Sequence, residues 1–131
     1  ELYTSLEQGV VDAAENNTPS FRTSRHYEVC KYFSLDEHTR LPDILVISTR
    51  IWNNLTDEFR RILQEAVDES VVYQRQLWAK AEQEDLETVK KAGVEVVYPD
   101  KALFQKSVES VWKEFEDSEI GQLIRQIQEV R

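Results

Sequence analysis

The amino-acid sequence predicts an α/β layer architecture, in which a short mixed sheet packs against one very long helix. Three observations lead to this prediction. The run 43–48, DILVIS, is rich in β-branched apolar residues, and an amphipathic helical pattern extends over 57–92. The predicted elements also follow one another as helix, strand, helix, strand, strand, long helix, strand and helix. This alternation is typical of sheets covered by helices.

The first 35 residues predict two strands and two short helical segments. Residues 1–8 have helical spacing, and Gly9 follows where a helix commonly ends. Residues 10–14 form a short apolar run that predicts a buried strand, and one or two irregular helical turns are expected up to residue 26. The aromatic and β-branched residues of 27–35 predict a second, mostly buried strand.

The middle of the chain carries the strongest patterns. Residues 43–48 predict a central strand that is covered on both faces. Thr56 is a good N-cap for the helix that follows, and Gly93 supplies its stop. An unbroken helix over 57–92 would extend about 54 Å at about 1.5 Å per residue. We expect a brace that packs against more than this chain, or else a helix divided by a kink near residue 82.

The last third of the chain predicts a short strand and two helices. Residues 94–98 have the strand pattern between Gly93 and Pro99. Asp100 can cap the first helix, whose apolar stripe includes Trp112, and a second stripe runs from Ile120 to Ile127. Tyr73, Trp78 and Trp112 lie on helical apolar stripes, so we expect them in the core rather than around a cofactor.

Composition limits the possible partners. The 131 residues are 40% hydrophobic and 31% charged, which suits one domain with a buried core. The formal net charge of −9 argues against nucleic acid and anionic membranes, because phosphate binding requires clustered Lys and Arg. No apolar run approaches the about 20 residues that span a bilayer. Cys30 is the single cysteine, so no intrachain disulfide can form. Its side chain is either a small buried apolar group or a reactive thiol.

Candidate ligand-binding residues follow the predicted strands, where ligands of open α/β sheets gather. They are Glu15, Asn16, His38 and Asp43, with Asp12 and Asn17 beside the first two. An Asn amide could donate to an organic carboxylate, but composition alone favours an Asx-turn or helix cap. His38 could likewise be a ligand residue or a structural histidine.

The enzyme signatures that we considered are absent, including phosphate loops, dinucleotide glycine fingerprints, zinc motifs and nucleophile elbows. A hydrolase with Glu15 as base and His38 as acid is conceivable only if the two side chains meet. Residues 36–38, DEH, could suggest a metal site, but consecutive strand residues face opposite ways. The sequence therefore predicts no enzyme, no metal and no cofactor.

Three segments resemble a known family. Residues 1–16, ELYTSLEQGVVDAAEN, resemble the E-x-Y-x-A-L-x-x-G-x-V-D-G-x-E-N segment of DctP-type solute receptors of tripartite ATP-independent (TRAP) transporters. Residues 26–32, HYEVCKY, are similar to a second family segment, and Thr56-Asp57-Glu58 is similar to the start of the family's long helix. Ala13 stands where the family commonly has Gly.

The resemblance implies the carboxy-terminal part of a two-lobed periplasmic-binding-protein fold. Residues 1–48 would belong to the second lobe, 56–92 to a bracing helix and 94–131 to the terminal strand and helices. The amino-terminal lobe would be absent, and we expect Glu1 to be a cut or processed end. The whole receptor would bind a dicarboxylate, sugar acid or similar organic acid in the bacterial periplasm and deliver it to a TRAP permease.

The resemblance also implies roles for single residues. Asn16 corresponds to the Asn that contacts the ligand carboxylate, and His38 to a histidine near the ligand of sialic-acid-binding relatives. Asp43 lies beside the region that tunes ligand choice. None of Arg22, Arg25 and Arg40 matches the family's carboxylate-clamping Arg, so we expect this chain alone to bind organic acids poorly.

A different function class remains open from the sequence. The apolar stripe of the long helix could pair with another protein or another copy of the chain, which would make the chain a helix-rich interaction or oligomerisation module. This chain could form a dimer or swapped oligomer under either interpretation.

Overall fold

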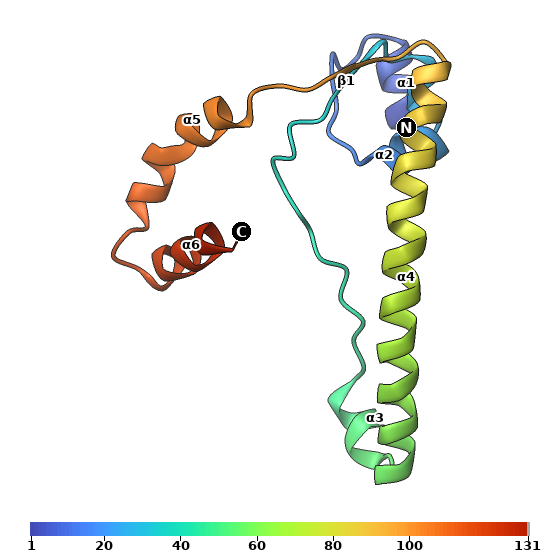
Figure 1. The fold of residues 1–131 in the computed structure, drawn as a ribbon, viewed down its shortest axis with the longest axis vertical. Helices are drawn as coiled ribbons and strands as arrows, with labels where there is room; N and C mark the ends of the chain where they lie inside the picture. Colours follow the sequence, from blue (N-terminus) through green and yellow to red (C-terminus); the bar gives the residue numbers. More distant parts are fainter. Residues whose placement is uncertain (131) are drawn as a thin grey trace. The chain divides into compact units, whose positions relative to one another are not determined.

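The computed structural model describes residues 1–130, which form helices joined by irregular segments and one pair of short strands (Figure 1). The elements in chain order are α1 (Leu2–Glu7), α2 (Thr18–Thr23), the 3-10 helix η1 (His26–Glu28), β1 (Tyr32–Ser34), α3 (Thr49–Asn54), α4 (Asp57–Lys91), β2 (Glu95–Val97), α5 (Lys101–Glu114) and α6 (Glu119–Glu129).

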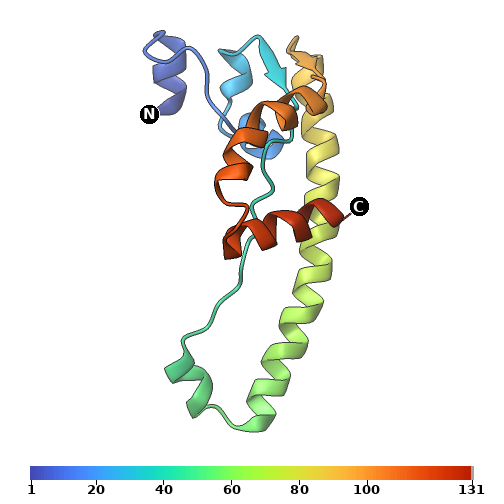
Figure 2. The same cartoon turned by 90° about the vertical axis from the view of Figure 1, so that its left-hand side faces the viewer.

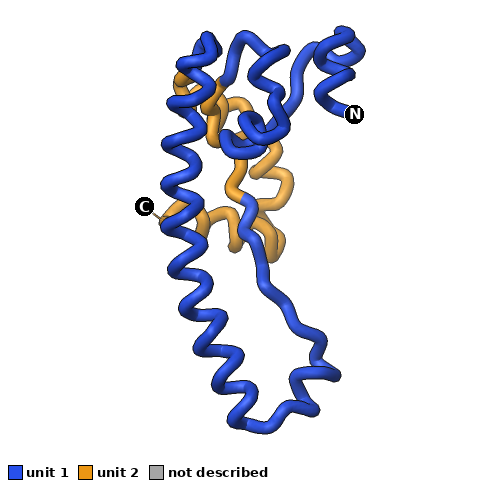
Figure 3. Tube along the Cα trace, turned by 90° about the vertical axis from the view of Figure 1, so that its right-hand side faces the viewer, with its two compact units in different colours: residues 1–33, 41–96 blue, residues 34–40, 97–131 orange. Residues whose placement is uncertain are grey.

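The chain divides into two units, which Figure 3 distinguishes by colour. Unit 1 comprises residues 1–33 and 41–96, and unit 2 comprises residues 34–40 and the chain from 97 onward. The polypeptide therefore passes between the units three times, after residues 33, 40 and 96.

The core of unit 1 lies where α2 packs on the carboxyl-terminal part of α4 (Figure 1). Phe21, Val89 and Val94 are its buried hydrophobic residues, and Val89 is 0% exposed. The Phe21 and Phe33 rings stack with their centroids 4.5 Å apart. Cys30 is half-buried against this cluster, as the interpretation of a small apolar side chain predicted.

Helix α4 is one continuous helix of 35 residues, about 52 Å long at about 1.5 Å per residue. Its capping agrees with the sequence prediction: the Thr56 hydroxyl accepts from the Phe59 N–H at 3.3 Å, and Gly93 has a φ of +95° just beyond the end. The alternative of two helices separated near residue 82 is wrong, because the helix continues through that position.

Most of the apolar stripe of α4 is exposed. Tyr73 is 63% exposed and Trp78 40%, so the prediction that these aromatic residues lie in the core is wrong within the part of the chain that the structure describes. The reason is the length of the helix, since α2 covers only its last turns. Trp112, on α5, is half-buried.

The predicted mixed sheet is a parallel pair of strands, β1 and β2. The Glu95 N–H donates to the Lys31 carbonyl and the Leu35 N–H to the Val97 carbonyl, each at 2.9 Å. The predicted strand 27–35 is shorter than expected, because its first residues form η1.

Two predicted strands are wrong. Residues 10–14 form a bend and irregular chain, and residues 43–48 form no strand on the way to α3 (Figure 2). Ile44, Leu45 and Val46 are more than 70% exposed. A strand requires a hydrogen-bonded neighbour, and within the described residues no other segment pairs with either run. Apolar patterning alone does not supply that neighbour.

Helix α3 was not predicted. The Arg60 side chain of α4 holds its end, because Nε donates to the Trp52 carbonyl at 3.0 Å and Nη2 donates to the Asn53 carbonyl at 3.1 Å. Such a long-range bond between side chain and backbone has no periodic signal in the sequence.

In unit 2, α5 and α6 pack against each other as a helical pair. The Asp100 carboxylate caps α5 by accepting from the Ala102 N–H at 3.0 Å, as predicted, and the Ser118 hydroxyl caps α6. Among the described residues, no helix combines the length and the apolar character that crossing a lipid bilayer requires.

Candidate functional site

Glu15 and Asn16 lie in the irregular segment between α1 and α2, in unit 1. Asn16 Oδ1 accepts from the Asn17 N–H at 3.0 Å, and Asn17 Oδ1 accepts from the Ser20 N–H at 2.8 Å. Asn17 is thus the N-cap of α2, which confirms the helix-cap interpretation for that residue. A carboxylate ligand would meet Asn16 at its Nδ2 donors, the end of the amide that this local bond does not use.

His38 lies in unit 2, four residues after β1 ends. Its Nδ1 is 2.8 Å from Asp36 Oδ1, and the hydrogen bond to His38 lowers the pKa of Asp36 below its usual 3.8. An ionised carboxylate only accepts hydrogen bonds, so Nδ1 carries a proton. The Asp36 carboxylate therefore fixes the orientation of the His38 ring through Nδ1.

Asp43 lies in the exposed segment that precedes α3 and belongs to unit 1. The four predicted residues are thus divided between the units, with Glu15, Asn16 and Asp43 in unit 1 and His38 in unit 2. A site that uses all four stays a prediction, as does a catalytic pair of Glu15 and His38.

No group of three His, Cys, Asp or Glu side chains in the described part of the chain is arranged to hold a metal ion. In the segment 36–38, Asp36 pairs with His38 and Glu37 pairs with Lys101 at 2.6 Å. These ion pairs account for the charged side chains that suggested a metal.

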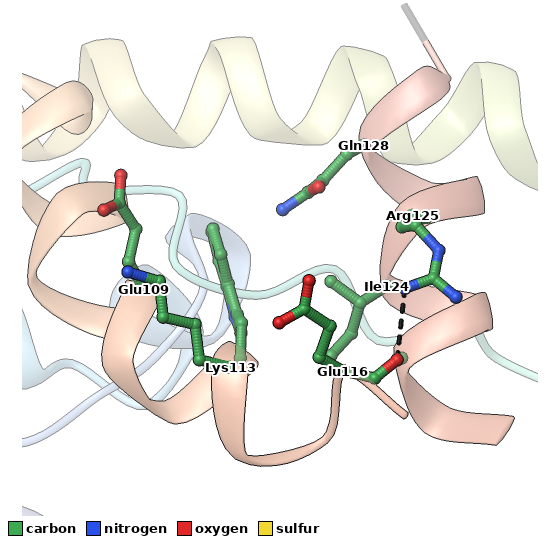
Figure 4. Close-up of a pocket in the computed structure, with 8 residues that line it drawn as sticks. Glu109, Lys113, Glu116, Ile124, Arg125 and Gln128 are labelled. Atoms are coloured by element: carbon green, nitrogen blue, oxygen red, sulfur yellow. Dashed lines mark hydrogen bonds between the residues drawn. The ribbon is translucent and has the colours of Figure 1, made fainter. Parts of the chain in front are cut away.

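A cavity of about 200 Å³ lies between α5 and α6 in unit 2 (Figure 4). It is lined by Glu109, Trp112, Lys113, Glu116, Gly121, Ile124, Arg125 and Gln128. Arg125 Nη1 donates to the Glu116 carbonyl at 3.2 Å, which joins two of the lining residues. None of the predicted site residues lines it, and it is smaller than the about 300–1,000 Å³ of typical ligand pockets.

Sequence comparison identifies the family. Residues 1–118 match the family model described as "Bacterial extracellular solute-binding protein, family 7", abbreviated DctP. The chain belongs to this family. The resemblance noted on residues 1–16 and 26–32 is thereby confirmed.

Solved TRAP periplasmic solute-binding proteins share the fold of this chain. A TRAP periplasmic solute-binding protein from Chromohalobacter salexigens, solved with bound D-glucuronate, superposes on it with a TM-score of 0.91 and 36% identity. One from Xanthobacter autotrophicus, solved with bound β-D-galacturonate, gives a TM-score of 0.86 and 40% identity. Each match covers 100% of this chain and 44% of the other.

A curated relative agrees with the structures. A solute-binding protein of Chromohalobacter salexigens is 37% identical over 134 residues, which is 100% of this chain and 40% of the relative. The chain thus spans less than half of the proteins that it matches. The fold class predicted from the sequence, part of a periplasmic-binding-protein fold with a long helix, is confirmed at this level.

Proposed function

We propose that the protein containing this chain is an extracytoplasmic receptor that binds a sugar acid and delivers it to a TRAP permease. The observation that carries the proposal is the pair of DctP structures with TM-scores of 0.86 and 0.91, each solved with a hexuronate bound. The family consists of solute receptors, and the proposal includes no catalytic step.

The proposed binding mode combines a carboxylate contact with hydroxyl contacts. Asn16 would donate through Nδ2 to the ligand carboxylate, and His38 would contact a second polar group of the ligand. Glu15 and Asp43 would contribute hydrogen-bond acceptors for hydroxyl groups. Preferential binding to the closed state would drive closure of the two lobes.

The three arginines in residues 1–48 are already paired with carboxylates. Arg22 Nε is 3.3 Å from Asp85 Oδ1, Arg25 Nε is 2.7 Å from Glu28 Oε1, and Arg40 Nη2 is 3.7 Å from Glu37 Oε2. Each of these guanidinium groups already faces a carboxylate, whereas a bidentate Arg is the main source of charge complementarity to an organic acid. We therefore propose that the 131-residue chain alone binds organic acids weakly.

Isothermal titration calorimetry of the full-length protein tests the proposal. D-glucuronate, D-galacturonate and succinate would each be titrated into the full-length protein, its Asn16→Ala variant and the 131-residue chain. We expect one hexuronate to bind the full-length protein and to bind the Asn16→Ala variant at least about tenfold more weakly. The 131-residue chain should give no measurable heat of binding. A full-length protein that binds none of these acids contradicts the proposal.

The matched control is Asn53→Ala, because Asn53 is an exposed residue in α3 that lies outside the proposed site. This variant should bind as the wild type does. If both Asn variants lose affinity equally, the loss at Asn16 reflects folding rather than ligand contact.

A second candidate function for the chain on its own is self-association. Leu41, Ile44, Leu45 and Val46 are each at least 71% exposed, and an unpaired apolar segment of this kind can pair with another copy. Light scattering after size exclusion should show a dimer whose fraction rises with concentration. Ile44→Lys is the control variant, and it should form less dimer than the wild type. A wild-type chain that is monomeric at every concentration contradicts this candidate.

A further inference from the structure

The cavity between α5 and α6 takes no part in the proposed sugar-acid site, because none of the predicted ligand residues lines it. Its volume is about 200 Å³. A cavity of about 150 Å³ is already large enough for a molecule the size of benzene, so this one suits a ligand of about five to eight non-hydrogen atoms. Trp112 and Ile124 are half-buried and supply the apolar part of its wall.

The turn that joins the two helices is tied directly to α6. The Phe115 carbonyl accepts from the Ser118 N–H at 2.9 Å and from the Ser118 hydroxyl at 2.6 Å. The Ser118 hydroxyl also accepts from the Gly121 N–H at 3.3 Å. Gly121 is buried, and a Cβ there would come closer to the Phe115 and Glu116 carbonyl oxygens than van der Waals contact allows. The position of Glu116 beside α6 is thus defined by the backbone.

Glu116 is held by its main chain, which leaves its side chain available. Its carbonyl accepts from Arg125 Nη1 at 3.2 Å, whereas its carboxylate has no ion pair and no hydrogen bond within the described residues. Figure 4 shows this carboxylate between the two helices, and the side chain of Gln128 reaches toward the same space from α6. A carboxylate and the oxygen of an amide both accept hydrogen bonds.

The two cationic residues of the cavity lining are directed elsewhere. Arg125 donates to the Glu116 carbonyl, and the Lys113 side chain runs away from α6 in Figure 4. Lys113 also lies one helical turn after Glu109, so these opposite charges offset each other on the surface of α5. The Glu116 carboxylate is therefore the charge that a ligand in this cavity meets, and Trp112 lines the same cavity.

We propose that this cavity is a second binding site, which takes a small organic ammonium ion. The ammonium group donates to the Glu116 carboxylate and to the side-chain oxygen of Gln128, and its carbon atoms lie against Trp112 and Ile124. An aromatic face attracts an ammonium group, and a hydrogen bond to an ionised carboxylate is stronger than a neutral one. The inference goes beyond the proposed function, since a sugar acid carries the opposite charge.

The test uses the full-length protein with ¹⁵N-labelled tryptophan. n-Butylammonium is the probe, and n-butyrate and n-butanol are comparison probes of similar shape with negative and zero charge. The indole N–H signal of Trp112, assigned by its loss in Trp112→Phe, reports binding in an NMR titration. Glu116→Gln removes the carboxylate at nearly constant shape. Glu114→Gln is the matched control, because Glu114 is an exposed residue of α5 that does not line the cavity.

We expect n-butylammonium to shift the Trp112 signal with a Kd of about 1–10 mM, because one cation–π contact and one charge-assisted hydrogen bond at an exposed site support only weak binding. n-Butyrate and n-butanol should bind at least about tenfold more weakly. Glu116→Gln should raise the Kd for n-butylammonium at least about tenfold, and Glu114→Gln should change it less than about twofold.

Three results overturn the inference. One is equal binding of the three probes, which would show that the cavity does not select a charge. Another is an equal effect of Glu116→Gln and Glu114→Gln, which would assign the attraction to the overall negative charge of the protein. The third is an unchanged Trp112 signal with n-butylammonium in the full-length protein. Hexuronate binding tests the proposed function separately, and its failure leaves this inference standing.

Discussion

Val89 is a buried position where one small change should cost measurable stability. Its side chain is 0% exposed in the core of unit 1. Val89→Ala removes two methyl groups, worth about 1.6 kcal/mol at about 0.8 kcal/mol per buried carbon. The cavity left behind adds about 1 kcal/mol, and the better helix propensity of Ala returns about 0.5 kcal/mol. The expected net loss is about 2 kcal/mol.

Val72→Ala is the matched control, because Val72 lies on the same helix and is 59% exposed. Val72→Ala gains helix propensity and leaves no cavity, so the free energy of unfolding should change by no more than about 0.5 kcal/mol. Urea unfolding of the 131-residue chain, followed by far-UV circular dichroism, measures both. A loss for Val89→Ala below about 1 kcal/mol, or equal to that of Val72→Ala, would refute the assignment of the core.

Three further predictions concern single residues. Gly121→Ala places a Cβ against the Phe115 carbonyl oxygen, closer than van der Waals contact allows, so we expect a loss of about 1–3 kcal/mol and faster amide exchange in α6; unchanged exchange argues against this packing. Burial raises the pKa of the Cys30 thiol, so it should react with a disulfide reagent more slowly in the folded chain than in urea; equal rates would contradict the assignment of Cys30 to the core. The hydrogen bond to Lys101 lowers the pKa of Glu37 below its usual 4.5. The ion pair therefore stabilises the folded state above pH 4.5, and this stabilisation is lost as the pH falls through the folded-state pKa of Glu37. NMR titration of the Glu37 carboxyl should show this, and an unchanged pKa in Lys101→Met would disprove the ion pair.

Helix ends were predictable because their signals are local. Thr56 and Asp100 cap α4 and α5 through bonds to residues two or three positions away, and Gly93 supplies the left-handed residue beyond α4. Each such interaction can be recognised within four residues of sequence. The apolar periodicity also predicted a long helix over 57–92, but it left open a kink near residue 82, and only the structure shows that the helix is continuous there.

Strands were predicted less well because their partners are distant in the sequence. The runs 10–14 and 43–48 have the composition of buried strands, yet no described segment pairs with them. The modest run 32–34 is a strand, because residues 95–97 lie beside it. Composition indicates that a segment suits a sheet, whereas pairing depends on which other segments are present.

The candidate site shows the same division. Asn16 and His38 were singled out from the sequence and from the family resemblance, but the contacts around them were not. His38 Nδ1 donates to Asp36 only two residues away, whereas the ion pair of Glu37 with Lys101 spans more than sixty residues and appears only in three dimensions. Nothing in the local pattern links a turn residue to the first residue of α5.

The sequence by itself determined the family, the long helix and the ends of the main helices, because these depend on motifs and on interactions within a few residues. Only the tertiary structure decided which apolar runs pair as strands, which stripe residues are buried and which side chains hold His38. Those outcomes depend mainly on contacts between residues that are distant in the sequence. Bringing such residues together costs chain entropy, and only the contact between both partners offsets that cost.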